Sequence, residues 1–115
     1  MIEFIRGDTK PFRFRIKNVN GQPIQKSEVD TLIMTCRKRD SEKSPILFEK
    51  NIDDFIFGED GFCHSQIKPE DTQNLEYGAY GFDIECTLLN GYRKTLKANF
   101  KITEEDTIHL IQSEV

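Results

Sequence analysis

The sequence predicts an all-β fold, an antiparallel β-sandwich of about seven strands. Short runs of alternating apolar and polar residues are separated by turn residues, and no stretch has the periodicity of a long amphipathic helix. The clearest pattern covers residues 78–102, where two alternating runs meet at Asn90-Gly91. A chain of 115 residues can bury a sufficient core without metals or cross-links. We therefore expect one sandwich domain over residues 1–107 and a short tail over 108–115.

The first predicted strand follows Pro11 and alternates strictly over residues 12–17. Large apolar side chains therefore point to one face of the strand, and cations point to the other. This pattern predicts a half-buried strand, which ends before a turn at Asn20-Gly21. The two faces carry Phe12, Phe14 and Ile16 on the apolar side and Arg13, Arg15 and Lys17 on the cationic side.

The middle of the chain is predicted to contain one central strand, several short strands and a single helical turn. Residues 31–37 carry apolar side chains on both faces, which favours a strand inside a sheet. Pro69 and the acids that follow it are typical of a first helical turn, which we expect within residues 69–75. Short strands are predicted at 46–49, within 51–60 and at 62–67, and a charged loop at 37–44.

The loop length of the last hairpin decides which side chains face each other. A two-residue turn at Asn90-Gly91 would place apolar and polar residues together on one face. A three-residue loop over residues 89–91, with Gly91 in the left-handed region, instead matches apolar residues across the pair. We therefore predict the bulged loop and these pairs: Ile84 with Leu96, Phe82 with Ala98, Tyr80 with Phe100 and, on the outer face, Asp83 with Lys97.

Composition limits the partners of the chain. Its net charge is −4, so we expect no nucleic acid partner, because that binding depends on a basic surface. Its apolar runs are far shorter than the stretch of about 20 residues that spans a bilayer, so we expect no membrane partner. The three cysteines, Cys36, Cys63 and Cys86, are widely spaced and do not indicate a disulfide framework. Cys36 and Cys86 fit buried, reduced thiols on strands.

No group of residues has the spacing of a catalytic or metal site, so we expect neither an enzyme nor a cofactor. Cys63 and His64 are adjacent and would point to opposite faces of a strand, which prevents the hydrogen bond that a nucleophile and its base require. His109 is the alternative base for that thiol. Four acids lack the spacing of a calcium loop and are predicted to form a solvated turn: Asp53, Asp54, Glu59 and Asp60.

Two short motifs and three aromatic residues suggest binding functions. Arg37-Lys38-Arg39 is basic, but the acids that follow it make a mixed surface loop. Arg6-Gly7-Asp8 spells a cell-adhesion tripeptide, for which a turn before the first strand is the simpler interpretation. Exposed aromatics can stack on sugar rings, which gives a module for host-surface carbohydrate as the alternative function. These aromatics are Phe57, Tyr77 and Tyr92.

Several motifs occur in a characteristic order between residues 3 and 107. They are Gly7-Asp8-Thr9, Phe12-x-Phe14-x-Ile16, Gly21-x-Pro23-Ile24, Arg37-Lys38, Lys68-Pro69-Glu70-Asp71-Thr72, Gly78-x-Tyr80-x-Phe82-Asp83-Ile84, Phe100-Lys101-Ile102-Thr103 and Asp106-Thr107. Together they resemble the N-terminal, immunoglobulin-like domain of the phage baseplate upper protein family. The resemblance implies an immunoglobulin-like sandwich without catalytic residues.

The resemblance also implies a structural and assembly role in a phage or prophage tail or baseplate. The implied partners are other tail or baseplate proteins, with a homo-oligomer as a further option. The implied location is the virion tail, after assembly in the cytoplasm of the bacterial host. In that family the domain anchors to the tail and usually continues into a region that displays receptor-binding proteins. Because this chain ends at Val115, we expect the anchoring role.

Overall fold

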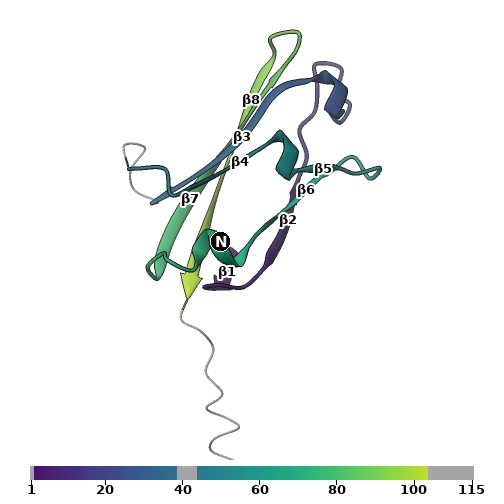
Figure 1. Ribbon diagram of the computed structural model, residues 1–115. Helices are drawn as coiled ribbons and strands as arrows, with labels where there is room; N and C mark the ends of the chain where they lie inside the picture. The colour runs from purple at the N-terminus through teal and green to yellow at the C-terminus, as the bar shows by residue number, and fades with distance from the viewer. Residues whose placement is uncertain (1, 39–43, 104–115) are drawn as a thin grey trace, which may run out of the picture.

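The computed structural model describes residues 2–38 and 44–103, which form two sheets packed face to face (Figure 1). The larger sheet has five strands in the order β1-β8-β7-β3-β4. Its neighbouring strands are antiparallel, except that β1 runs parallel to β8. Its strands are β1 (Ile2–Ile5), β3 (Val29–Lys38), β4 (Phe48–Asn51), β7 (Gly78–Leu88) and β8 (Arg93–Thr103).

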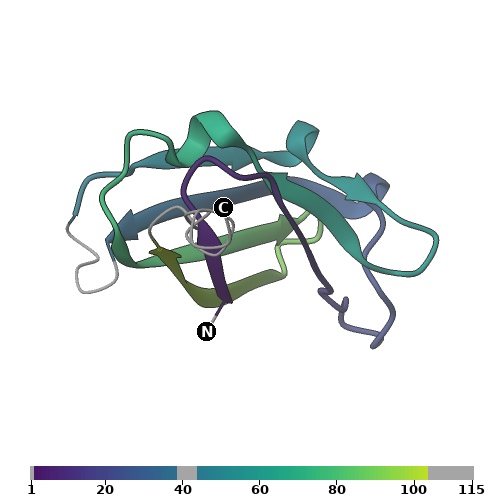
Figure 2. The same cartoon turned by 90° about the horizontal axis from the view of Figure 1, so that it is seen from below.

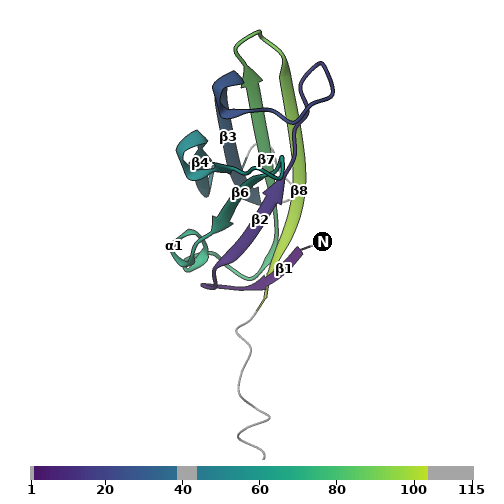
Figure 3. The same ribbon diagram turned by 90° about the vertical axis from the view of Figure 1, so that its right-hand side faces the viewer.

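The smaller sheet has three strands in the order β2-β6-β5 and covers the inner face of the larger one (Figure 3). Short helical turns lie between strands: η1 before β3, η2 between β4 and β5, and α1 between β6 and β7. The predicted immunoglobulin-like sandwich with one short helical turn near residues 69–75 is therefore confirmed. The bounds are β2 (Lys10–Phe14), β5 (Ile56–Phe57), β6 (Cys63–Ile67), η1 (Lys26–Glu28), η2 (Ile52–Asp54) and α1 (Pro69–Thr72).

Aromatic rings from both sheets form the centre of the core. Phe100 on β8 has no exposed surface, and its ring stacks on Tyr80 of β7 with centroids 5.5 Å apart. Phe82 joins the two layers, because its ring lies 5.8 Å from that of Phe100 and 6.1 Å from that of Phe12 on β2. The buried Tyr80 hydroxyl donates a hydrogen bond to the Glu76 carbonyl at 2.6 Å. The ring keeps its apolar contacts while its polar atom is satisfied.

The predicted register of the last hairpin is confirmed. β7 and β8 pair Tyr80 with Phe100, Phe82 with Ala98, Ile84 with Leu96 and Asp83 with Lys97. The loop between the strands has three residues, since the Leu88 N–H donates to the Tyr92 carbonyl at 2.8 Å and closes it. Gly91 adopts a φ of +90°, the left-handed conformation that glycine reaches without steric cost.

β1 was not predicted from the sequence. It pairs in parallel with the last residues of β8, a long-range contact between the first and the last described strands (Figure 2). Arg6-Gly7-Asp8 then forms the turn that takes the chain to the other sheet, with Gly7 at a φ of +86°. The Asp8 N–H donates to the Ile5 carbonyl at 3.1 Å, so the turn interpretation of this tripeptide is confirmed.

The other predicted elements are present with shifted bounds. The first predicted strand ends as β2 at Phe14, although Ile16 is buried and its carbonyl accepts a hydrogen bond from the Ile24 N–H at 2.9 Å. The strand predicted within 31–37 is β3, which lies between β7 and β4 as expected for a central strand. The predicted tail with His109, and loop residues 39–43, lie outside the described residues.

Candidate binding face

The outer face of the smaller sheet carries two arginines and one aromatic ring. Arg13 lies on β2 directly opposite His64 of β6, and Arg15 continues the same face. The alternation of the chain turns both arginines outward, while Phe12 and Phe14, which alternate with them, pack against the core. Phe62 immediately precedes β6 and lies on the same side of the sheet as His64. We call Arg13, Arg15 and Phe62 the arginine face.

Both arginines stack on the same aromatic ring. The guanidinium carbons of Arg13 and Arg15 each lie 4.2 Å from the centroid of the Phe62 ring. This is within the distance of about 6 Å at which a cation is attracted to an aromatic face. Each contact of this kind contributes about 0.5–1 kcal/mol at an exposed site. The ring thereby holds two long side chains in place that would otherwise sample many rotamers.

After the hydrogen bond from the Phe62 backbone, the positive charge of Arg13 also contributes to the lowered pKa of Asp60, so this carboxylate lies close enough to act on the arginine face. No carboxylate of residues 2–38 and 44–103 forms an ion pair with Arg13 or Arg15. Arg93 on β8 differs, because it forms an ion pair with Glu85 at 3.0 Å. Within residues 2–38 and 44–103, the guanidinium N–H donors of the arginine face therefore have no hydrogen-bond acceptor.

A tight loop between β5 and β6 positions Phe62. The Asp60 carboxylate accepts hydrogen bonds from the Phe62 N–H at 3.0 Å and from His64 Nε2 at 3.0 Å. These two bonds, with the backbone bond the larger cause, lower the pKa of Asp60 below its usual value. A Cβ at Gly58 would lie 2.6 Å from Asp60 Oδ1, so a larger residue there would displace the Asp60 side chain. His64 is therefore a structural partner of Asp60.

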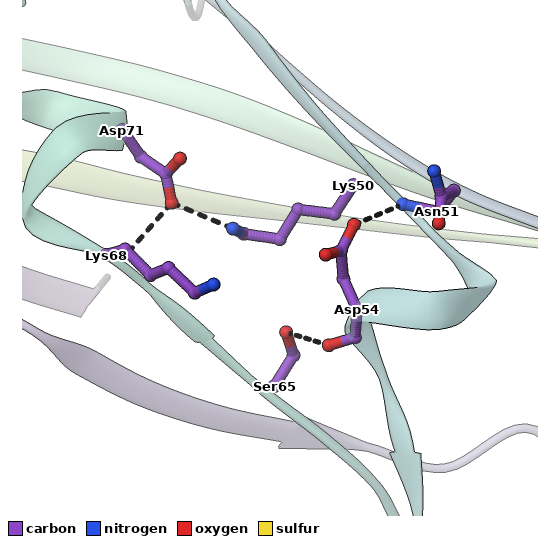
Figure 4. A network of polar contacts seen from close by, with 6 residues as sticks. All are labelled: Lys50, Asn51, Asp54, Ser65, Lys68 and Asp71. Carbon is purple, nitrogen blue, oxygen red and sulfur yellow. Dashed lines mark hydrogen bonds and ion pairs between the residues drawn. The ribbon is translucent and has the colours of Figure 1, made fainter.

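A second polar region lies beside β6, where a groove of about 370 Å³ opens between η2 and β6 (Figure 4). The Asp71 carboxylate, on α1, accepts hydrogen bonds from Lys50 Nζ of β4 and from the Lys68 N–H, both at 2.8 Å. The Lys50 side chain is only 6% exposed, so this is a largely buried ion pair. The groove is lined by Lys50, Asp53, Asp54, Ile56, His64, Ser65, Gln66 and Lys68.

Most polar groups of this groove are used by the fold itself. The Asp54 carboxylate accepts from the Asn51 N–H at 2.9 Å, and Ser65 Oγ donates to the Asp54 carbonyl at 2.8 Å (Figure 4). These bonds attach η2 to β4 on one side and to β6 on the other. The groove is therefore a joint between the two sheets, and the arginine face is the better candidate for binding a ligand.

The four predicted turn acids divide between two turns. Asp53 and Asp54 lie in η2, whereas Glu59 and Asp60 lie in the loop after β5. Among the described residues, no three histidine, cysteine, aspartate or glutamate side chains gather as a metal ion would require. Within the same ranges, no helix has the length and apolar character needed to cross a bilayer.

The remaining residues considered from the sequence are not brought together. Tyr77 is 43% exposed, but its ring lies under the Arg6 guanidinium at 4.4 Å. Phe57 and Tyr92 pack against the core, so the three aromatics do not form one platform. In the basic tripeptide, Lys38 forms an ion pair with Glu76 at 3.2 Å. Arg37 is half-buried, and its Nε has no hydrogen-bond partner among the described residues.

Sequence reasoning found the cationic side of β2 but missed Phe62. The alternation of residues 12–17 placed Arg13 and Arg15 on one face. Their stacking on Phe62 depends on the pairing of β2 with β6, two strands separated by about half of the chain. The position of Phe62 at the start of a predicted strand could have suggested an exposed ring. It did not indicate which strand would lie beside that ring.

The three cysteines are buried and reduced, as predicted for Cys36 and Cys86. Burial raises the pKa of Cys36 to about 12 and that of Cys63 to about 11, from an ordinary value of 9.0. Because His64 is bonded to Asp60, no base among the described residues activates the Cys63 thiol.

Slow thiol labelling is the expected result of this burial. At pH 8 we expect Ellman's reagent to label none of the three cysteines rapidly in the folded protein and all of them in urea, because the reagent needs an accessible thiolate. A Thr95→Cys variant, exposed on β8, should label at once and serves as the control. Rapid labelling of the folded parent chain would contradict the expectation.

The buried thiols also make stability depend on pH. Folding raises the pKa values of Cys36 and Cys63, so the thiols ionise first in the unfolded chain. The free energy of unfolding should therefore fall as the pH rises above 9.0.

Comparisons with known proteins support the fold and give no family. No family model matches the chain, and no curated protein matches it. Among solved structures, it is similar to CopC from Methylosinus trichosporium OB3b, with a TM-score of 0.53 and 11% sequence identity. The match covers 92% of this chain and 86% of the CopC chain. At this identity the likeness establishes a shared β-sandwich fold only.

The predicted phage or prophage tail function is wrong on these comparisons. The structural likeness is to CopC, which is not a phage tail module, and no comparison provides a phage relative. The carbohydrate-binding alternative falls with it, since its three aromatics do not gather. The family resemblance and the virion location stay predictions.

Proposed function

We propose that this chain is a non-enzymatic binding module that recognises a carboxylate-rich segment of another protein through its arginine face. The observation that carries the proposal is the pair of guanidinium groups at 4.2 Å from the Phe62 ring, with no carboxylate of the described residues paired to either. Guanidinium groups bind carboxylates through two parallel hydrogen bonds, a geometry that suits aspartate and glutamate. Hydrogen bonds to charged groups are also stronger than neutral ones.

The stacked arrangement favours binding because the arginine side chains have lost part of their rotamer entropy before the ligand binds. A free arginine side chain loses about 2 kcal/mol of rotamer entropy when a ligand immobilises it. Stacking on Phe62 restricts both side chains before the ligand arrives, so a larger share of the interaction energy becomes affinity. The loop held by Asp60 keeps the ring itself in place.

An acidic protein segment fits this face better than a nucleic acid does. The whole chain carries a net charge of −4, which would repel an extended phosphate backbone. Asp60 lies next to the arginine face and is ionised at neutral pH, which limits the cationic area to the two guanidinium groups. Such a small area matches two or three carboxylates rather than a long polyanion.

The test is an NMR titration of the ¹⁵N-labelled protein with a short peptide that contains aspartates. We expect shifts of the amide signals around Arg13, Arg15 and Phe62, and binding weakened about tenfold by Arg13→Gln or Arg15→Gln. Arg93→Gln is the matched control, because Arg93 is exposed but already paired with Glu85. It should leave the affinity almost unchanged.

Two results would overturn the proposal. An equal loss of affinity in Arg93→Gln would show general charge attraction instead of recognition by the arginine face. Tighter binding of a single-stranded oligonucleotide at the same residues would assign the face to nucleic acid. A peptide with lysines in place of the aspartates should not bind in either case.

A further inference from the structure

We infer that the acidic segment binds as an added β-strand on the open edge of β2, and that its carboxylates occupy alternate positions. This inference rests on the proposed function and adds the conformation and the residue pattern of the partner. It follows from the direction of the backbone groups of β2, from the open position of that strand and from the two-residue spacing of the arginines.

The backbone direction of β6 is fixed by one hydrogen bond. In antiparallel sheets, successive residues of a strand direct their N–H and C=O groups alternately to its two neighbours. The Gly58 N–H donates to the Phe62 carbonyl at 2.9 Å, so Phe62 bonds toward the β5 side. His64, two residues on, shares that direction and pairs with β5. Cys63 and Ser65 therefore direct their backbone groups toward β2.

The same alternation places the backbone of the arginines on the open side of β2. Phe14 and Phe12 are opposite Cys63 and Ser65, so they exchange hydrogen bonds with β6. The backbone N–H and C=O groups of Arg13, and of Arg15 beyond it, consequently point away from β6. Pro11 shares this direction, and an edge position that faces away from the ladder is where a strand tolerates the missing N–H of proline.

That side of β2 is an open edge. The smaller sheet has the order β2-β6-β5, so among the described residues no strand pairs with the outer side of β2. Figure 1 shows β2 at the rim of the molecule, beyond β6, and in Figure 3 the strand faces the viewer. An extended segment that pairs there would add a fourth strand to this sheet, a common mode of peptide recognition.

The spacing of the arginines sets the residue pattern of the partner. Arg13 lies on β2 and Arg15 lies one residue beyond its end, and both stack on Phe62, so the two side chains share one face about 7 Å apart along the chain. In an added strand, side chains at alternate positions lie on that same face, opposite the two arginines. Carboxylates at positions i and i+2 of the partner therefore lie on the same face of the sheet as the two arginine side chains, while adjacent carboxylates point to opposite faces.

Peptides of identical composition test this inference. One peptide carries aspartates at positions i and i+2, and a second carries them at i and i+1, with threonines elsewhere. We expect the alternating peptide to bind about tenfold more tightly, the loss expected when one charge-assisted hydrogen bond is absent. Methylation of the backbone nitrogens in the centre of the alternating peptide should weaken its binding. When the unmethylated peptide binds, hydrogen exchange of the Arg13 and Arg15 amides should slow.

The outcomes separate this inference from the proposed function. If both peptides bind equally and backbone methylation has no effect, the strand-addition inference is wrong, while recognition of acids by the arginine face stands. If neither peptide binds, both are wrong. If the alternating peptide binds better but the preference persists in the Arg13→Gln/Arg15→Gln double variant, the spacing rule does not arise from the arginines.

Discussion

Replacing Asp71 by alanine is expected to lower the free energy of unfolding by about 3–5 kcal/mol. The reason is the largely buried Lys50 ammonium, which is bonded to the Asp71 carboxylate at 2.8 Å. Without the carboxylate, that charge has to stay buried without a partner or leave the joint between the sheets. The Lys68 N–H also loses its acceptor. Urea unfolding followed by circular dichroism measures the change.

An exposed ion pair provides the comparison for Asp71→Ala. Lys38 and Glu76 are 3.2 Å apart, but their side chains are 55% and 84% exposed. Pairs of this kind contribute at most about 1 kcal/mol, so Glu76→Ala should change little. Adding Lys50→Met to the Asp71→Ala variant should restore much of the lost stability, since it removes the unpaired charge. Equal effects of Asp71→Ala and Glu76→Ala would show that the buried pair adds nothing specific.

Replacing Phe100 by alanine is expected to lower the free energy of unfolding by about 3–5 kcal/mol, because it removes packing in the core. The ring has no exposed surface and contacts the rings of both Tyr80 and Phe82. Its removal leaves a cavity at the centre of the aromatic cluster that joins the two sheets. Thermal and urea unfolding both report the loss.

A graded series makes the Phe100 prediction decisive even if the alanine variant fails to fold. Phe100→Leu fills much of the cavity and should cost clearly less than alanine. Leu89→Ala, at the exposed hairpin tip where Leu89 is 70% exposed, is the control and should be nearly neutral. A neutral Phe100→Leu together with a costly Leu89→Ala would contradict the assigned core.

Local patterns allowed the hairpin to be predicted down to its register. The three-residue loop was identified because only that length matched apolar with apolar residues on both strands, and Gly91 provided the left-handed residue that the loop needs. The central strand β3 was identified for a similar reason, since a strand with apolar residues on both faces needs neighbours on both sides. These features depend on residues that lie close together in the chain.

Long-range pairings could not be predicted in the same way. β1 is only four residues long and pairs in parallel with the end of β8, a contact that no local pattern indicates. The arginine face likewise needs the pairing of β2 with β6 before Phe62 can meet Arg13 and Arg15. The sequence showed the cations, whereas the ring that orders them became visible only in three dimensions.

The open edge of β2 also determines how the chain behaves toward copies of itself. Two molecules that joined edge to edge along β2 would bring Arg13 and Arg15 of one copy against the same arginines of the other. Like charges across adjacent strands are destabilising, and Pro11 shortens the stretch that could pair. Salt shortens the distance over which the arginines of two copies repel each other. At high ionic strength and high protein concentration, the β2 edge therefore discriminates less between an acidic strand and a second copy of the chain. At low ionic strength, the sign of the charge alone separates an acidic strand from a second copy.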